Sequence, residues 1–162
     1  MSFHDVSRPA TPAQAPMQRV HVMGNTLTFH LRSGMTGGGF TLVECETLPG
    51  AGTPPHLQSH DDEAFFVLKG RYEFRIGDAR VTRGPRSFVQ IPRGTVHAFR
   101  NADRAPARML ILNWPGGLHE AFLDAIGTPI DDIAAEPPAE GPALPALLAA
   151  AKASGIELMR AR

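Results

Sequence analysis

The chain of 162 residues has almost no cysteine, no excess of either charge and no long apolar run. Its single cysteine, Cys45, cannot form an intramolecular disulfide, so nothing marks an oxidising compartment. Sixteen basic and sixteen acidic residues cancel, which argues against nucleic acid as a partner, because phosphate binding needs surplus Lys and Arg. No apolar stretch approaches the roughly 18 residues of a membrane span, so no membrane association is expected.

The first residues, MSFHDVSRPATPAQAP, also lack the apolar segment that a secretion signal requires. We therefore expect a soluble cytoplasmic protein. Residues 1–18 are rich in Pro, Ala, Ser and Gln, a composition that predicts a flexible N-terminal arm.

Glycine and proline are abundant instead, with 16 and 15 residues, and they separate many short segments. Between residues 19 and 116, about eight to ten of these segments have the alternating or continuous apolar patterns of strands. This organisation predicts one all-β domain, a sandwich or a barrel.

The composition changes after residue 117. Residues 118–126 carry apolar side chains at helical spacing and stop at Gly127, and residues 144–153 are rich in Ala and Leu. Residues 117–162 are therefore predicted to form a helical extension that packs on the outside of the barrel.

One stretch, GAGTPPHLQSHDDEAFFVLKG at residues 50–70, crowds imidazoles and carboxylates beside a predicted buried strand. His56, His60 and Glu63 fall within eight residues of one another. A second stretch, PRGTVHAFRN at residues 92–101, supplies His97. Imidazole and carboxylate ligands suit Zn, Fe, Mn, Ni or Cu. We expect the two stretches to meet and hold one divalent transition metal ion.

The two stretches resemble the two conserved motifs of the cupin superfamily. The first motif has the form G-(X)5-H-X-H-(X)3,4-E-(X)6-G, and four residues stand at its spacing: Gly50, His56, Glu63 and Gly70. The second has the form G-(X)5-P-X-G-(X)2-H-(X)3-N, and four residues match its intervals: Pro92, Gly94, His97 and Asn101. With TGGGFTLVE before and PGGLHEAF after them, the resemblance covers about residues 20–132.

The chain looks like a small single-domain cupin of the kind described as quercetin-dioxygenase-like. The resemblance implies a cupin double-stranded β-helix, or jelly-roll barrel, with short C-terminal α-helices. A homodimer is expected as well, because such a barrel has exposed sheet edges and the N-terminal arm can add a strand across an interface.

The resemblance also implies that His56, Glu63 and His97 are three ligands of the usual three-His, one-Glu set. The fourth position holds Gln58, where the family usually has histidine. A Gln carbonyl oxygen can ligate, as it does around zinc in the phosphomannose-isomerase branch of the superfamily. His60 is the alternative fourth ligand if the loop is distorted. A site without metal, in which the two histidines line a polar cavity, is a further alternative.

A second departure from the pattern lies in the turn before Pro92. The relatives' usual PGD turn reads Pro85-Arg86-Ser87, so Arg86 stands where they have glycine. We expect this change to alter a surface turn and to leave the ligands in place.

Several apolar side chains are expected near the metal. Phe65, Val67 and Phe99 share strand parity with the ligands, and they either fill the core or line an apolar substrate pocket. The candidate pocket residues are Phe40, Leu42, Phe65, Val67, Phe99, Met109, Ile111 and Asn113. The histidines outside the motifs are interpreted as ordinary surface or partly buried residues: His4, His21, His30 and His119.

The function implied by the resemblance is that of a metal-dependent, dioxygenase-like enzyme acting on a small, partly apolar organic molecule. Glu63 doubles as the catalytic base in this hypothesis if it is not tightly ligated. Two alternatives stay open. One is a non-redox isomerase or lyase, which Gln58 favours, and the other is a non-catalytic cupin that binds a small molecule.

Overall fold

The computed structural model describes residues 18–130 and 141–159. The predicted arm over residues 1–18 therefore lies outside the described residues except for its last position. Part of the predicted extension, residues 131–140, lies outside them too. In the part of the chain that is described, no helix has the length and apolar character needed to cross a membrane.

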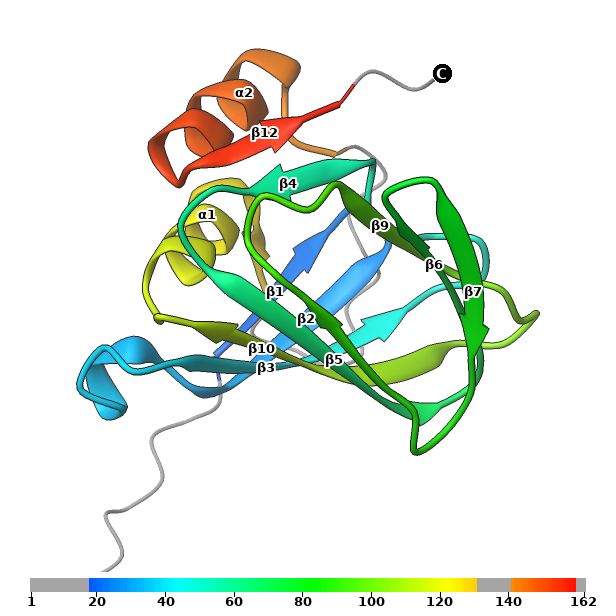
Figure 1. Ribbon diagram of the computed structural model, residues 1–162. Helices are drawn as coiled ribbons and strands as arrows, with labels where there is room; N and C mark the ends of the chain where they lie inside the picture. Colours follow the sequence, from blue (N-terminus) through cyan, green and yellow to red (C-terminus); the bar gives the residue numbers. More distant parts are fainter. Residues whose placement is uncertain (1–17, 131–140, 160–162) are drawn as a thin grey trace, which may run out of the picture.

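The strands form two antiparallel sheets that face each other across one core (Figure 1). The strands of the larger sheet are β1 (Arg19–Val22), β2 (Asn25–Leu31), β3 (Thr41–Thr47), β5 (Asp62–Lys69), β8 (Phe88–Ile91), β10 (Ala107–Trp114) and β11 (Thr128–Pro129). Those of the smaller sheet are β4 (His56–Gln58), β6 (Tyr72–Ile76), β7 (Ala79–Arg83), β9 (His97–Asn101) and β12 (Ile156–Leu158). The spatial orders are β11-β1-β2-β3-β10-β5-β8 and β12-β4-β9-β6-β7.

Two α-helices and one short 3-10 helix, η1 (Ser33–Met35), complete the described elements. The helices α1 (Leu118–Ile126) and α2 (Leu144–Ala153) have the bounds that the sequence predicts. In Figure 1, both helices and β12 lie on the same side of the barrel as β4. The predicted all-β class with short C-terminal helices is confirmed.

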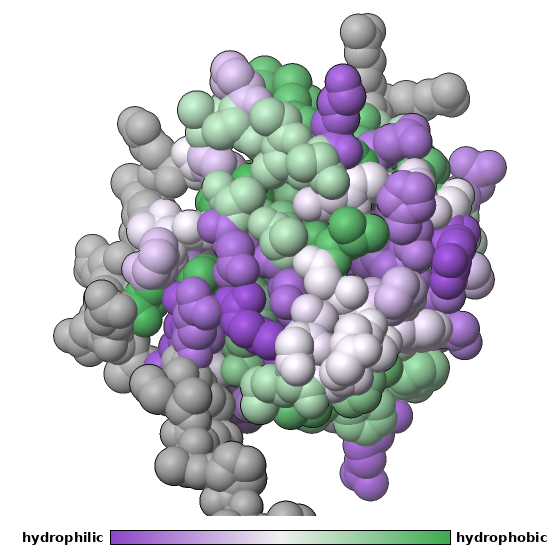
Figure 2. Space-filling model, turned by 90° about the vertical axis from the view of Figure 1, so that its left-hand side faces the viewer, coloured by the Kyte–Doolittle hydropathy of each residue, from purple (hydrophilic) through white to green (hydrophobic). Residues whose placement is uncertain are grey.

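The outer surface of this helical side is mixed in polarity. In Figure 2, which faces it, light green hydrophobic residues gather in the upper part, at the height of α2. Purple hydrophilic residues gather mostly below them. The C-terminal segment thus covers part of the barrel and leaves some of its own apolar side chains in contact with solvent, such as Leu144 and Leu148.

Alternation along the strands decides which side chains reach the core. The centre of the core is a group of buried aromatic rings whose centroids lie 5.2–6.0 Å apart: Phe65, Tyr72, Phe74 and Phe99. Burying each ring contributes roughly 1.5–3 kcal/mol relative to leaving it exposed. Cys45 is fully buried, as a small apolar side chain would be.

The turn before β8 contains the departure from the motif at Arg86. The φ angle of Arg86 is 69°, so this side chain occupies the left-handed region that glycine adopts without penalty. Its backbone N–H donates a hydrogen bond to the carbonyl of Val67 at 2.8 Å, which holds the turn in this conformation. The left-handed conformation of Arg86 therefore costs about 1–2 kcal/mol of steric strain.

Arg86→Gly is therefore expected to raise the free energy of unfolding by roughly 0.5–1 kcal/mol, because relief of the strain exceeds the added entropy of the unfolded chain. Arg83→Gly is the matched control, since Arg83 lies in β7, an extended strand, where glycine costs about 0.5–1 kcal/mol. Urea denaturation of both variants measures the difference. Destabilisation by both substitutions would contradict this account of the turn.

Candidate metal centre

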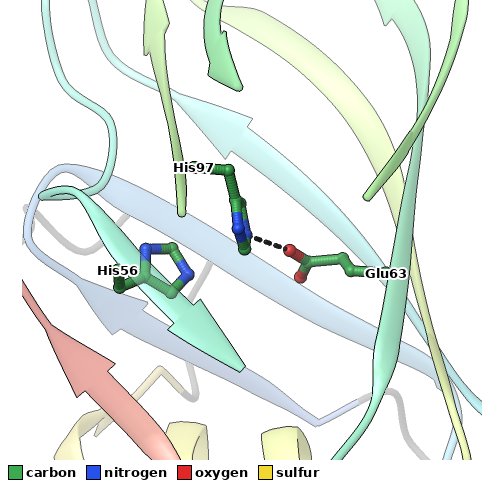
Figure 3. Close-up of side chains that lie close together, drawn as sticks. All are labelled: His56, Glu63 and His97. Carbon is green, nitrogen blue, oxygen red and sulfur yellow. Dashed lines mark hydrogen bonds and ion pairs between the residues drawn. The ribbon is translucent and has the colours of Figure 1, made fainter. Parts of the chain in front are cut away.

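Three side chains from three strands converge inside the barrel (Figure 3). His56 begins β4, Glu63 is the second residue of β5, and His97 begins β9. One ligand atom from each lies within 4.8 Å of the other two. His56 and His97 are direct partners in the β4–β9 pair, with ring centroids 4.3 Å apart, whereas Glu63 comes from the opposite sheet. Sheet pairing therefore brings these residues together from positions 41 apart in the sequence.

Hydrogen bonds to the backbone fix the orientation of both imidazoles. Nδ1 of His56 lies 2.9 Å from the carbonyl oxygen of Pro54, and Nδ1 of His97 lies 2.9 Å from that of Thr95. A carbonyl oxygen only accepts, so each Nδ1 carries the hydrogen. Nε2 is then the nitrogen that faces the cluster, and such an orienting hydrogen bond is typical of histidines that bind metal.

The electrostatics favour coordination. Burial and the neighbouring His97 lower the pKa of His56 to about 4, so its Nε2 lone pair is available at neutral pH. Burial alone would raise the pKa of Glu63, but hydrogen bonds from His119 and His97 hold it well below its usual value. Burial disfavours the charged form of His97, yet its bond to Glu63, with Nε2 and Oε2 2.8 Å apart, raises its pKa.

This donor set fits a divalent transition metal ion. Two imidazole nitrogens and one carboxylate oxygen are ligands that Zn, Fe, Cu and Ni share. The residues are buried, with 8%, 2% and 2% of His56, Glu63 and His97 exposed, so a bound ion would be shielded from bulk water. A metal would take the place of the proton that His97 shares with Glu63.

Gln58 stands at the fourth ligand position of the motif. Gln58 is 2% exposed, and its Oε1 accepts a hydrogen bond from Nδ2 of Asn113 at 3.1 Å. Its Nε2 is buried and has no partner among the described residues. Ligation by Gln58 therefore stays a prediction. The alternative ligand His60 is exposed, with its ring against Gly155, and lies outside the donor cluster, so the structure gives this alternative no support.

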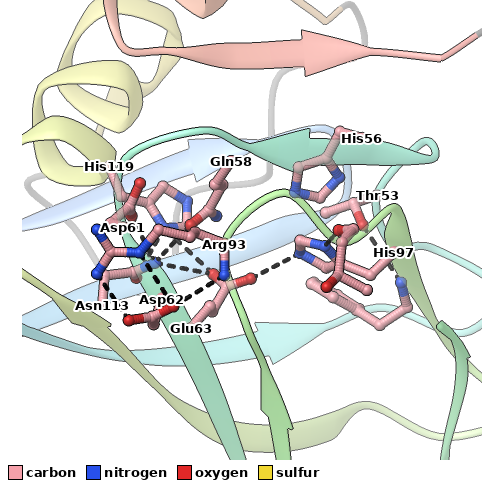
Figure 4. A network of polar contacts seen from close by, with 12 residues as sticks. Thr53, His56, Gln58, Asp61, Asp62, Glu63, Arg93, His97, Asn113 and His119 are labelled. Carbon is pink, nitrogen blue, oxygen red and sulfur yellow. Dashed lines mark hydrogen bonds and ion pairs between the residues drawn. The ribbon is translucent and has the colours of Figure 1, made fainter. Parts of the chain in front are cut away.

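Asn113 is the centre of a polar network beside the cluster (Figure 4). It lies opposite Glu63 in the β5–β10 pair. Its Nδ2 lies 3.1 Å from Oε1 of Gln58, 3.1 Å from Oδ2 of Asp61 and 3.2 Å from Oε1 of Glu63. Its Oδ1 accepts a hydrogen bond from Nδ1 of His119 at 2.7 Å. Two amide hydrogens serve three acceptors here, which ties these side chains into one unit.

His119 was expected to be an ordinary surface or partly buried histidine, but it contacts the candidate metal centre. Only 13% of its side chain is exposed, and its Nδ1 lies 3.2 Å from Oε1 of Glu63. The signal was present in the sequence, because His119 precedes Leu123 and Ile126 by four and seven residues and so shares their helical face. Those two residues form the buried face of α1.

Two other histidines outside the motifs, His21 and His30, do not belong to the cluster. His21 is buried, and its Nε2 accepts a hydrogen bond from the backbone N–H of Gly24 at 3.2 Å. His30 pairs with Glu44, with Nε2 and Oε2 3.2 Å apart. His4 lies outside the described residues.

A cavity of about 70 Å³ opens beside the donor cluster, between the barrel and the C-terminal elements. His56, Glu63, Asn113 and His119 belong to its wall. Most of the remaining wall is apolar, and part of it comes from elements beyond the barrel: Phe122, Leu123, Ile126, Leu147, Ile156 and Leu158. None of these six residues was expected in the pocket from the sequence.

Six of the eight predicted pocket residues face the interior. Those that line the cavity are Phe99, Ile111 and Asn113. Those that are buried in the core without lining the cavity are Phe65, Val67 and Met109.

Phe40 and Leu42 are not among the residues that line this cavity, and their role in a substrate pocket stays a prediction. The buried positions of β3 alternate with Leu42, and Val43 and Cys45 are the residues that reach the cavity. The polar Thr41 occupies an interior position of the same strand. Because Thr41 is polar, the pattern of apolar residues did not show which face of the strand points inward.

Part of the chain matches a known family, and its fold is similar to solved structures. Residues 43–113 match the family model described as Cupin domain. The polyketide cyclase RemF from Streptomyces resistomycificus is similar with a TM-score of 0.54 and 24% identity, over 62% of this chain and 75% of that one. KdgF from Halomonas sp. gives 0.53 and 17%, over 58% and 81% of the two chains. A predicted oxalate decarboxylase from Thermotoga maritima gives 0.53 and 14%, over 60% and 91%.

At these identities the solved structures establish the fold alone. No curated protein sequence matches the chain. The predicted cupin fold is confirmed, and the narrower resemblance to quercetin dioxygenases stays a prediction.

His97→Ala is expected to abolish metal uptake, because it removes one of two imidazole ligands and leaves Glu63 without a partner on Oε2. His60→Ala is the matched control, since it deletes an exposed imidazole only a few residues from the site. Elemental analysis after metal loading and desalting compares the metal content per chain. The assignment fails if His60→Ala loses the metal and His97→Ala keeps it.

Proposed function

We propose that the cupin domain over residues 43–113 holds one divalent transition metal ion and that the protein is a dioxygenase-like enzyme acting on a compact, mostly apolar organic molecule. The observation that supports this proposal is the position of a two-histidine, one-carboxylate cluster in the wall of an apolar cavity. Two histidines and one carboxylate with open coordination positions are typical of non-haem Fe(II) oxygenases.

In this proposal His56 and His97 bind the ion through Nε2, and Glu63 binds it through Oε2, which already faces His97 at 2.8 Å. An iron ion held by these residues would supply the activation of dioxygen. The side chains around it keep bulk water away from the reacting atoms, because the cluster and the aromatic residues beside it are buried.

Glu63 is better supported as a ligand than as the catalytic base. Hydrogen bonds hold its pKa well below the usual value despite burial, and a carboxylate of low pKa is a weak base at neutral pH. The catalytic role of Glu63 stays a prediction.

The cavity limits the size of the substrate. A volume of about 70 Å³ is roughly half of the ~150 Å³ cavity that holds one benzene ring. A short carbon chain, or a single ring that the cavity encloses only in part, suits this space better than a three-ring flavonol does. The apolar wall contacts the body of such a molecule, and the polar groups of Asn113 and His119 contact an oxygen on it.

A non-redox isomerase or lyase is the second candidate. The observation that favours it is the hydrogen-bonded pair of Glu63 and His119, which gives the cavity wall a group that can hold or release a proton. Such chemistry would convert the substrate without consuming oxygen.

The proposal predicts oxygen uptake by the Fe(II)-loaded protein with compact probes such as single-ring phenols and short 1,3-diketones. An oxygen electrode and product analysis by mass spectrometry measure it. Glu63→Gln is expected to lower the rate by more than about 100-fold, because loss of a direct ligand exceeds the loss of an outer hydrogen bond. Glu46→Gln, on the exposed face of β3, serves as the matched control with an unchanged rate.

Conversion of a probe by the metal-loaded protein without oxygen uptake would contradict the oxygenase and support the isomerase or lyase. Binding of the probes without conversion would contradict both and support a non-catalytic binding protein.

A further inference from the structure

An imidazole from outside residues 43–113 touches the candidate metal centre. Nδ1 of His119, in α1, lies 3.2 Å from Oε1 of Glu63 and 2.7 Å from Oδ1 of Asn113. The other carboxylate oxygen of Glu63, Oε2, faces His97 at 2.8 Å. Oε2 of Glu63 thus faces the donor cluster, whereas Oε1 faces His119 of the C-terminal helix and also accepts a hydrogen bond from Nδ2 of Asn113 at 3.2 Å (Figure 4).

The geometry argues that His119 is not itself a ligand. It does not belong to the group of described residues whose donor atoms lie within 4.8 Å of one another. Its Nδ1 faces two oxygen acceptors, so this nitrogen carries a hydrogen and has no lone pair to offer to a metal. His119 therefore contacts the metal centre only through the carboxylate of Glu63.

The first turn of α1 is anchored, which fixes the place of this imidazole. Oε2 of Glu120 accepts hydrogen bonds from the backbone N–H of Ser33 at 2.9 Å and from Oγ1 of Thr41 at 2.8 Å. One turn later, Asp124 accepts two hydrogen bonds from the guanidinium of Arg32, at 2.8 and 2.9 Å. The helix is therefore attached to the segment around η1 and β3 and does not depend on the imidazole for its position.

We propose that His119 is a positioning residue of the metal centre, which holds Oε1 of Glu63 so that Oε2 stays turned toward the metal ion. This inference rests on the proposed metal binding. Ligating carboxylates are commonly held by such outer hydrogen bonds, and their loss typically lowers metal affinity by about 10–100-fold.

The same helix also closes the cavity. Phe122, Leu123 and Ile126 contribute to the cavity wall from α1, within two turns of the imidazole. The C-terminal extension consequently shapes the space for the substrate and orients a ligand with a single element. A cupin barrel without this helix would lack both contributions.

Titration of the metal-free protein with Co(II), followed by visible absorption and calorimetry, tests the role of His119. His119→Ala is expected to bind one equivalent about 10–100-fold more weakly than the wild type. His119→Asn places an amide N–H close to the position of Nδ1 and is expected to recover most of the affinity. His30→Ala removes a histidine–glutamate pair of the same 3.2 Å separation far from the centre and is expected to bind like the wild type.

The outcomes separate this inference from the metal site itself. If the wild type binds no Co(II), the proposed metal centre fails and His119 has no ion to serve. If the wild type binds and His119→Ala binds equally well, the positioning role is overturned. Equal weakness of His119→Asn and His119→Ala would show that the donated hydrogen bond is not the cause.

Discussion

The buried carboxylate of Glu63 is the constraint on which the rest of the site depends. A charged group that is only 2% exposed is strongly disfavoured unless charged or hydrogen-bonding partners surround it. His97 supplies a partner for one oxygen, and Asn113 and His119 supply partners for the other. These partners come from β9, β10 and α1, so the carboxylate is stable only when both sheets and the C-terminal helix are assembled around it.

The fold explains why these groups meet. Pairing of β4 with β9 sets His56 against His97, and pairing of β5 with β10 sets Glu63 against Asn113. The two pairs lie in different sheets, and closure of the barrel brings them face to face. Beyond them, α1, α2 and β12 add the apolar wall of the cavity. A metal centre that opens onto an apolar space is the arrangement expected for chemistry on a small organic molecule.

The motif spacing was sufficient to predict the cupin fold and to single out His56, Glu63 and His97. The reason is that the intervals of the family motifs reflect which strand positions point into the barrel. The helix bounds could be predicted from the helical spacing of apolar residues and from the glycines that follow the helices. The apolar face of α1 indicated that His119 points inward, but no local pattern showed that this face meets Glu63, 56 residues away in the sequence. Phe40 and Leu42 were expected in the pocket because the polar Thr41 hid which face of β3 points inward. The homodimer, the cytoplasmic location and the binding of a metal ion stay predictions.

The most direct measurement is an anomalous difference map from crystals of the protein loaded with Fe(II) or Co(II). The account predicts one peak within coordination distance, about 2.0–2.2 Å, of Nε2 of His56, Nε2 of His97 and Oε2 of Glu63, with His119 bonded to Oε1 of Glu63. A peak elsewhere in the chain, or no peak at this cluster, would contradict it.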